Sequence, residues 1–331
     1  MPLQIGILGA AGIAPAAVVR PARRRDDGTA VVAVASRRGA PEAYARQHGI
    51  PRAHASYEAL LADDAVDLVY VALPPSAHAE WTIAALEAGK DVLCEKPFTM
   101  TAEEAQRVAD AAVRTGRRVI EAFHDHYHPL EAAVRELVAA GRLGAVRSFT
   151  AVFDGSNPYD PRSVRHAPEL GGGALMDLGC YPVHWVRSLF GEPVVQQASF
   201  VPNPLGVDLS IAALLELPGG MTGSVAASMV DGVALRSELV IEGDAGRLHV
   251  SNLVFPSQGH SIRLEADGLP RTWTVAGQET YDHQLAAVVE ALATGTPLPT
   301  EGEDPVANMR VLDAVHHAAG MTWPPAGGSR A

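Results

Sequence analysis

The stretch Leu3-Gln4-Ile5-Gly6-Ile7-Leu8-Gly9-Ala10-Ala11-Gly12-Ile13-Ala14 decides the fold of the first part of this chain. A short apolar run that ends in glycine is typical of a buried parallel strand. The residues from 13 to 19 predict a helix, whose first N–H groups and dipole could meet the pyrophosphate of a dinucleotide. The pattern Gly9-x-Ala11-x-x-Ala14 has alanine at two of the usual glycine positions. Taken alone, it also fits an ordinary tight strand-to-helix turn.

Strands and helices are expected to alternate through the rest of the first third. The pattern predicts strands over residues 30–35, 66–73, 91–94 and 118–123, and helices over 77–88 and 102–114. Alternation with short connections indicates a doubly wound parallel sheet with helices on both faces. We therefore expect an α/β Rossmann domain over residues 1–122.

The end of the second strand indicates which nucleotide is bound. NAD-specific sites place an acidic residue there for the ribose 2′-OH, whereas this strand ends in Ala35-Ser36-Arg37-Arg38. A hydroxyl and guanidinium groups can bind a 2′-phosphate, although two solvated arginines would give the same pattern. We expect NADP(H) rather than NAD(H). The candidate nucleotide contacts from these two segments are Gly9, Ala11, Gly12, Ile13, Ser36, Arg37 and Arg38.

After residue 123 the alternation stops. Strands are expected over residues 146–154, 194–201, 209–217, 223–229, 235–242, 248–250, 262–265 and 272–275, and helices over 281–293 and 305–319. Short turns between successive strands predict an open, mostly antiparallel sheet. Residues 123–331 are therefore predicted to form an α+β domain.

Two segments carry candidate catalytic groups. Glu95-Lys96-Pro97 follows the strand at 91–94, which places a lysine at the carboxyl edge of the sheet, where ligands bind in this architecture; a surface lysine in a turn is the alternative. On an α-helix, Asp177, Tyr181 and His184 fall at i, i+4 and i+7 and share one face. That set suits acid–base chemistry, although a polar face turned to solvent is also possible.

The combination of Glu95-Lys96-Pro97 with Asp177-Leu178-Gly179-Cys180-Tyr181-Pro182 resembles the Gfo/Idh/MocA oxidoreductases. The similarity continues through Leu73-Pro74-Pro75-Ser76-Ala77-His78, Glu121-Ala122-Phe123, His128-Pro129 and the stretch from Asn308 to Ala314. Many members have histidine where Tyr181 stands. The tyrosine form is similar to the branch with glucose–fructose oxidoreductase, NADP-dependent xylose dehydrogenases and dimeric dihydrodiol dehydrogenase.

The resemblance implies an NADP-dependent enzyme that transfers a hydride between nicotinamide and a carbinol or carbonyl carbon of a sugar, polyol or cyclic trans-diol. It implies that Lys96 and Tyr181 form the catalytic pair and that Asp177 orients the substrate. Further nucleotide contacts are expected from Leu73, Pro74, His78, Glu95 and Lys96. Candidate substrate contacts are Arg165, His184, His126 and Phe123. The family also implies a homodimer, formed through the open face of the second sheet, or a higher homo-oligomer.

The histidines at 124, 126 and 128 alternate, and on a strand they would share one face and could suggest zinc. We expect no metal, because hydride transfer needs none and no carboxylate or cysteine partner is evident. His126 stands where the family often has arginine.

Composition limits the partners. The net charge of −12 disfavours nucleic acid, and no apolar run approaches the roughly 20 residues that cross a bilayer. Two distant cysteines suggest no disulfide framework, in keeping with a cytoplasmic protein. Two alternatives remain: an NADP-binding regulatory protein that has lost catalysis, and a glycoside hydrolase that uses the nucleotide transiently.

Overall fold

The structure is a computed structural model that describes residues 2–37, 39–266 and 268–324. The described chain divides into two compact units. Of the described residues, the first unit contains those up to 123 together with 281–306, and the second unit contains those from 124 to 280 and from 307 to 324.

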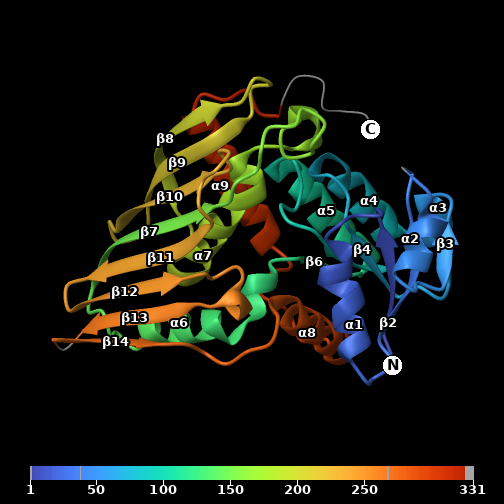
Figure 1. Cartoon of the computed structure of the whole chain (residues 1–331), viewed down its shortest axis with the longest axis horizontal. Coiled ribbons are helices and arrows are strands. Elements are labelled where there is room, and N and C mark those ends of the chain that lie inside the picture. The colour runs from blue at the N-terminus through green and yellow to red at the C-terminus, as the bar shows by residue number, and fades with distance from the viewer. Residues whose placement is uncertain (1, 38, 267, 325–331) are drawn as a thin grey trace. The chain divides into compact units, whose positions relative to one another are not determined.

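A parallel sheet forms the centre of the first unit (Figure 1). Its described strands are β1 (Gln4–Leu8), β2 (Ala30–Ala35), β3 (Arg52–His54), β4 (Leu68–Val71), β5 (Asp91–Cys94) and β6 (Val119–Glu121). They pair in the order β3-β2-β1-β4-β5-β6. The order reverses direction between β1 and β4, and ligands bind at such a switch point, outside the carboxyl ends of the strands. The predicted Rossmann fold is confirmed.

Helices connect these strands. They are η1 (Pro15–Val19, a π-helical turn), α1 (Arg20–Arg24), α2 (Pro41–Gln47), α3 (Tyr57–Leu61), α4 (Pro75–Glu87) and α5 (Ala102–Thr115). The sequence analysis missed α2, β3 and α3, which are too short for their apolar periodicity to stand out. The expected regular helix over 13–19 was also wrong, because this segment is a π-helical turn that leads into α1.

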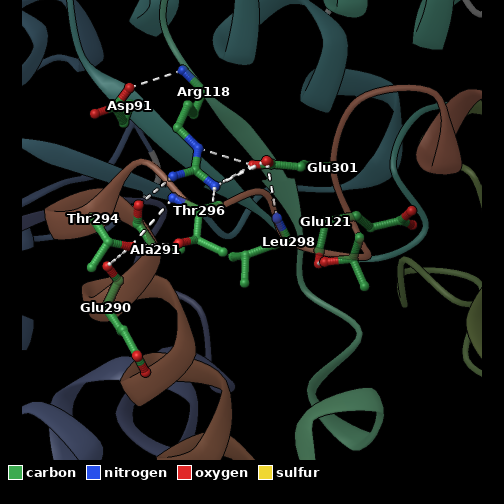
Figure 2. A network of polar contacts seen from close by, with 10 residues as sticks. Asp91, Arg118, Glu121, Glu290, Ala291, Thr294, Thr296, Leu298 and Glu301 are labelled. Carbon is green, nitrogen blue, oxygen red and sulfur yellow. Dashed lines mark hydrogen bonds and ion pairs between the residues drawn. The ribbon is translucent and has the colours of Figure 1, made fainter.

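A segment distant in the sequence completes the first unit. Helix α8 (Thr280–Thr294) contributes Leu285 and Val288 to the same apolar core as β1 and β4. Figure 2 shows how the chain after α8 is held at the edge strand β6. Arg118 donates to both carboxylate oxygens of Glu301 and to the carbonyl of Thr296. The Thr300 carbonyl accepts from the Glu121 N–H, and the Thr300 hydroxyl donates to the Glu121 carbonyl. A partly buried bidentate ion pair therefore holds the segment after α8 at the edge strand β6.

The second unit is built on an eight-stranded sheet (Figure 1). Its strands are β7 (Val146–Asp154), β8 (Val194–Pro202), β9 (Asp208–Glu216), β10 (Thr222–Ser228), β11 (Arg236–Gly243), β12 (Gly246–Ser251), β13 (Ser261–Ala266) and β14 (Leu269–Trp273). They pair in the order β14-β13-β12-β11-β7-β10-β9-β8, and among the described strands of this sheet only β7 and β10 form a parallel pair. The prediction of an open, mostly antiparallel sheet is confirmed.

One face of this sheet is covered by helical segments. The unit contains η2 (His124–Tyr127), α6 (Pro129–Ala139), η3 (Pro168–Leu170), η4 (Leu175–Gly179, a π-helical turn), α7 (Cys180–Phe190), η5 (Pro256–Gln258) and most of α9 (Asp304–Ala318). Segments η4 and α7 pack on β7 and β10; the residues of β10 alternate between buried and less buried positions, and the last four residues of β7 are all buried. The sequence analysis did not single out α6. In the described part of the chain, no helix is both long and apolar enough to span a bilayer.

Candidate functional site

The glycine loop after β1 is shaped by its backbone. Gly9 has a φ of +100°, and a Cβ there would lie 2.4 Å from the carbonyl oxygen of Ala72. The Gly9 N–H donates to the Ala35 carbonyl, so the loop is tied to both neighbouring strands. The Tyr44 hydroxyl donates to the carbonyl of Ala11 over 2.9 Å, and burial raises the pKa of Tyr44 to about 12. Only glycine fits at position 9 without moving this backbone.

The next two residues of the loop are open. Gly12 and Ile13 are exposed, and a Cβ added at Gly12 would meet nothing within 4 Å. Ala14, at the third glycine position, is fully buried. The loop thus presents accessible backbone beside the start of η1, which is what a pyrophosphate requires.

The carboxyl ends of β4 and β5 are joined by a buried histidine. The two ring nitrogens of His78 lie 2.7 Å from the carbonyl oxygen of Leu73 and 2.9 Å from that of Pro97. Burial lowers the pKa of His78, against the opposing effect of the carbonyl oxygens of Leu73 and Pro97. Pro74 caps α4 directly after Leu73. This histidine fixes the loop that follows Lys96.

Glu95 and Lys96 leave the sheet at the end of β5. The Tyr70 hydroxyl donates to the Glu95 carboxylate, and the Glu95 N–H donates to the carbonyl of Val71. Burial, together with the Glu95 charge, holds the pKa of Tyr70 well above its ordinary value. Lys96 is half-buried at this carboxyl edge, as the sequence predicted for a strand end.

Arg37 is held on an aromatic surface at the end of β2. Its guanidinium carbon lies 4.5 Å from the ring centre of Trp81 and 5.0 Å from that of Tyr57. It also donates to Glu58 over 2.7 Å. Ser36 beside it is buried. Arg37 is therefore not a freely solvated arginine, and Arg38 lies outside the described residues.

In the second unit, the glycine run at 171–173 brings Arg165 to Asp177. A Cβ at Gly172 would lie 2.7 Å from the Arg165 carbonyl, and the Gly173 N–H donates to that same oxygen. The Arg165 Nε then donates to Asp177 over 2.6 Å. Two of the predicted residues are thus an ion pair, with half of the Arg165 side chain exposed.

The predicted helical face of Asp177, Tyr181 and His184 needs correction. Asp177 lies in the π-helical turn η4, whereas Tyr181 and His184 lie in α7. A π-helical turn has more residues per turn than an α-helix, so the spacing i, i+4, i+7 does not define one face across Gly179. Tyr181 and His184, three residues apart in α7, remain neighbours.

Tyr181 is hydrogen-bonded to a residue that the sequence analysis did not assign to the site. Its hydroxyl lies 3.1 Å from Nε2 of His124, and Nδ1 of His124 lies 2.7 Å from the hydroxyl of Thr280. All three side chains are buried. The partners are 57 and 156 residues apart in the sequence, so no local pattern could connect them.

A second cluster lies beside the first. The rings of His126 and His184 are 5.2 Å apart, edge to face. The indole N–H of Trp185 donates to the buried carboxylate of Asp125 over 2.6 Å. Burial raises the pKa of Asp125 to about 6, against the opposing effects of the Trp185 hydrogen bond and the nearby His184. Phe123, which ends the first segment of the first unit, is fully buried.

The histidine run is not a strand. Residues 124–127 form a short 3-10 helix, so the premise that alternating histidines share a strand face was wrong. His124 contacts Tyr181, His126 contacts His184, and the His128 side chain accepts from the N–H of Leu130 as the N-cap of α6. Among the described residues, no group of three or more histidine, cysteine or acidic side chains has the arrangement of a metal site.

Comparisons with known proteins cover almost the whole chain. Residues 3–123 match the model of an oxidoreductase family with an NAD-binding Rossmann fold, and residues 132–249 match the GFO/IDH/MocA C-terminal domain. A D-xylose 1-dehydrogenase (NADP(+)) from Haloferax volcanii is 37% identical, over 96% of this chain and 97% of that protein. A dTDP-3,4-didehydro-2,6-dideoxy-alpha-D-glucose 3-reductase from Saccharopolyspora spinosa is 34% identical, over 96% and 97%.

Solved structures are also similar to this chain over almost its whole length. A 3-ketoreductase from Actinomadura kijaniata, in complex with NADP and TDP-benzene, superimposes with a TM-score of 0.88 at 28% identity. The match covers 96% of this chain and 98% of that one.

Proposed function

The chain belongs to the Gfo/Idh/MocA family of oxidoreductases, and from this premise we propose that it is an NADP(H)-dependent enzyme acting on a sugar, polyol or cyclic trans-diol. The reaction transfers a hydride between nicotinamide and a carbinol or carbonyl carbon. Names of the relatives support this range, since they include a xylose dehydrogenase, a ketoreductase and a trans-dihydrodiol dehydrogenase.

The observation that carries the choice of NADP(H) is the environment of Arg37. The residues that directly follow β2 in the sequence, Ser36-Arg37-Arg38, include no acid, and the Arg37 guanidinium is held against Trp81 and Tyr57 and pairs with Glu58. A guanidinium that is already ordered loses less side-chain entropy when it binds a phosphate. Ser36 and Arg38 are proposed to contribute to the same 2′-phosphate site.

The remaining nucleotide contacts are assigned to the carboxyl edge of the first sheet. The open backbone at Ala11, Gly12 and Ile13 after Gly9 suits the pyrophosphate. Leu73, Pro74, His78 and Glu95 are proposed to border the bound nucleotide. When bound, the nicotinamide supplies the hydride acceptor or donor.

Tyr181 is proposed to exchange the proton of the substrate hydroxyl, with Lys96 as its charged partner. A tyrosine is a poor base at neutral pH unless a cation or hydrogen-bond donor stabilises the phenolate. Asp177, paired with Arg165, is proposed to orient a second substrate hydroxyl. His126, His184 and Phe123 are proposed to shape the substrate pocket.

The experiment that tests this function is an absorbance assay of nicotinamide reduction and oxidation. NADP⁺ and NAD⁺ are each offered with aldoses, inositols and trans-diols, and NADPH with keto-sugars. We expect turnover with one substrate group and a marked preference for NADP(H). Tight NADPH binding without turnover across the panel would instead favour the regulatory alternative.

We also propose that the second unit, which makes up most of the predicted domain over residues 123–331, binds the substrate and pairs with a second copy; residues 281–306 belong to the first unit instead. The outer face of β8 and β9 exposes Val194, Val201 and Leu214, which are 63%, 55% and 44% accessible. Apolar side chains gathered on an open sheet face are typical of an interface. Light scattering on the purified protein should give the mass of a dimer; a monomer at micromolar concentration would contradict the pairing.

A further inference from the structure

Three buried groups form a continuous hydrogen-bonded chain behind the proposed catalytic tyrosine. The Tyr181 hydroxyl lies 3.1 Å from Nε2 of His124, whose Nδ1 lies 2.7 Å from Oγ1 of Thr280. Tyr181, His124 and Thr280 are each 3% accessible. They come from α7, η2 and the first residue of α8.

The three hydrogen-bonded side chains allow a proton to move in either direction between Tyr181 and Thr280. A neutral imidazole has one donor and one acceptor nitrogen, and a threonine hydroxyl can rotate to donate or accept. When His124 donates from Nδ1 to Thr280, its Nε2 accepts the proton of Tyr181. When Thr280 donates to Nδ1, the His124 Nε2–H donates to the tyrosine oxygen. Both arrangements satisfy every group in the chain.

Aromatic rings surround these three hydrogen-bonded side chains. The His124 ring lies 5.8 Å from that of Tyr181 and 6.2 Å from that of Phe255, and Phe153 packs edge to face against Tyr181 at 5.4 Å. In a setting of low polarity, a hydrogen bond is stronger, and an unpaired partner is more costly, than in water. A histidine placed only for packing would not need both ring nitrogens at hydrogen-bonding distance from hydroxyl groups.

We propose that His124, oriented by Thr280, is the proton acceptor and donor behind Tyr181. In the oxidative direction, the phenol proton of Tyr181 moves to Nε2 of His124, and the tyrosine oxygen takes the proton of the substrate hydroxyl. The carbon loses its hydride, with both electrons, to the oxidised nicotinamide, and a carbonyl forms. The imidazolium then releases one proton to solvent. Reduction runs the same transfers backward.

This assignment rests on the proposed role of Tyr181 and makes His124 and Thr280 positioning residues that act through it. The protonation of the two His124 ring nitrogens can be measured by NMR in the absence of nucleotide. In ¹⁵N NMR of the nucleotide-free protein, the His124 ring nitrogens should report one donor and one acceptor nitrogen. Tyr181→Phe should shift the Nε2 resonance, and Thr280→Val should shift Nδ1. Unchanged resonances in both variants would show that Tyr181, His124 and Thr280 are not hydrogen-bonded to one another and would contradict the proposal.

The kinetic test compares Thr280→Val with Thr280→Ser. Valine has nearly the same shape as threonine but has no hydroxyl, whereas serine keeps the hydroxyl. We expect Thr280→Val and His124→Met to lower kcat by about 10-fold or more, with KM and the NADPH Kd within about twofold. The solvent deuterium isotope effect on kcat should rise in both, because proton transfer becomes slower. Thr280→Ser should recover most of the turnover.

The outcomes separate the two proposals. If Tyr181→Phe keeps full turnover, the proposed role of Tyr181 fails. If Tyr181→Phe is inactive while His124→Met and Thr280→Val keep the kcat and isotope effect of the parent protein, the relay is wrong and the function stands. Equal losses in Thr280→Val and Thr280→Ser would also contradict the relay, because the hydroxyl would not be the group that matters.

Discussion

The nucleotide edge of the first unit and the buried polar cluster of the second unit are built in different ways. At the nucleotide edge, backbone geometry sets the shape: Gly9 has no room for a Cβ, and His78 binds two carbonyl oxygens. In the second unit, side chains bind side chains, as in the contacts of His124 with Tyr181 and Thr280. A backbone site follows from local sequence, whereas a side-chain network depends on long-range packing.

Both regions contain the same local helix geometry. Each contains a π-helical turn that leads into an α-helix carrying a proline near its start, Pro21 in α1 and Pro182 in α7. A proline ring clashes with the carbonyl four residues earlier and donates no hydrogen bond. A wider turn before the proline relieves that conflict. This geometry changes which residues share a face.

The largest effect expected at the backbone site is that of Gly9→Ala. The methyl group would meet the Ala72 carbonyl at 2.4 Å in a left-handed conformation, so we expect a loss of about 2–4 kcal/mol in unfolding free energy and no measurable NADPH binding. Gly12→Ala is the control, since its Cβ enters open space and stability should not change. Thermal unfolding and fluorescence titration measure both. Normal NADPH affinity in Gly9→Ala would contradict the backbone account.

A smaller effect on NADPH binding is expected from Arg37, the main side chain that we assign to nucleotide choice. Arg37→Met keeps an apolar chain against Trp81 but removes the charge. NADPH affinity should fall by about 10- to 100-fold, while NADH affinity stays within about twofold. Glu58→Gln removes the competing carboxylate partner of Arg37 and should not weaken NADPH binding. An equal loss of NADPH and NADH affinity in Arg37→Met would disprove this assignment.

The smallest expected effect is on the pH dependence of stability, and it comes from a buried carboxyl group at the start of η4 in the second unit. Asp208 accepts from the N–H of Leu175 at the start of η4, and burial raises the pKa of Asp208 to about 7. Between about pH 4 and pH 7 the folded protein keeps a proton that the unfolded chain releases, so stability from this group falls as pH rises through that window. Below and above the window this contribution is constant.

Asp208→Asn keeps an oxygen for Leu175 and removes the titration. Relative to this variant, the parent protein should lose about 1 kcal/mol or more of unfolding free energy between about pH 5 and pH 8. Urea unfolding at both pH values measures the difference. Parallel stability curves for the two proteins would show that Asp208 is ionised in the folded state throughout.

The sequence predicted the elements with strong periodicity and the motifs at their ends. The strand at 91–94 with Lys96 after it, and the strand at 30–35 with Arg37 after it, lie as expected because strand ends in a parallel sheet are local features. The pairing of His124 with Tyr181 and Thr280 could not be predicted, since it joins residues far apart along the chain. The spacing rule for Asp177 failed because it assumed an unbroken α-helix.

The most direct test of the central claim is turnover of Tyr181→Phe with the substrate found in the nucleotide assay. This substitution removes one hydroxyl from a buried ring and should leave the NADPH Kd within about twofold. We predict that kcat falls by about 100-fold or more, and that Lys96→Ala gives a loss of the same order. Full turnover in Tyr181→Phe would show that the proton is exchanged elsewhere and would contradict the account.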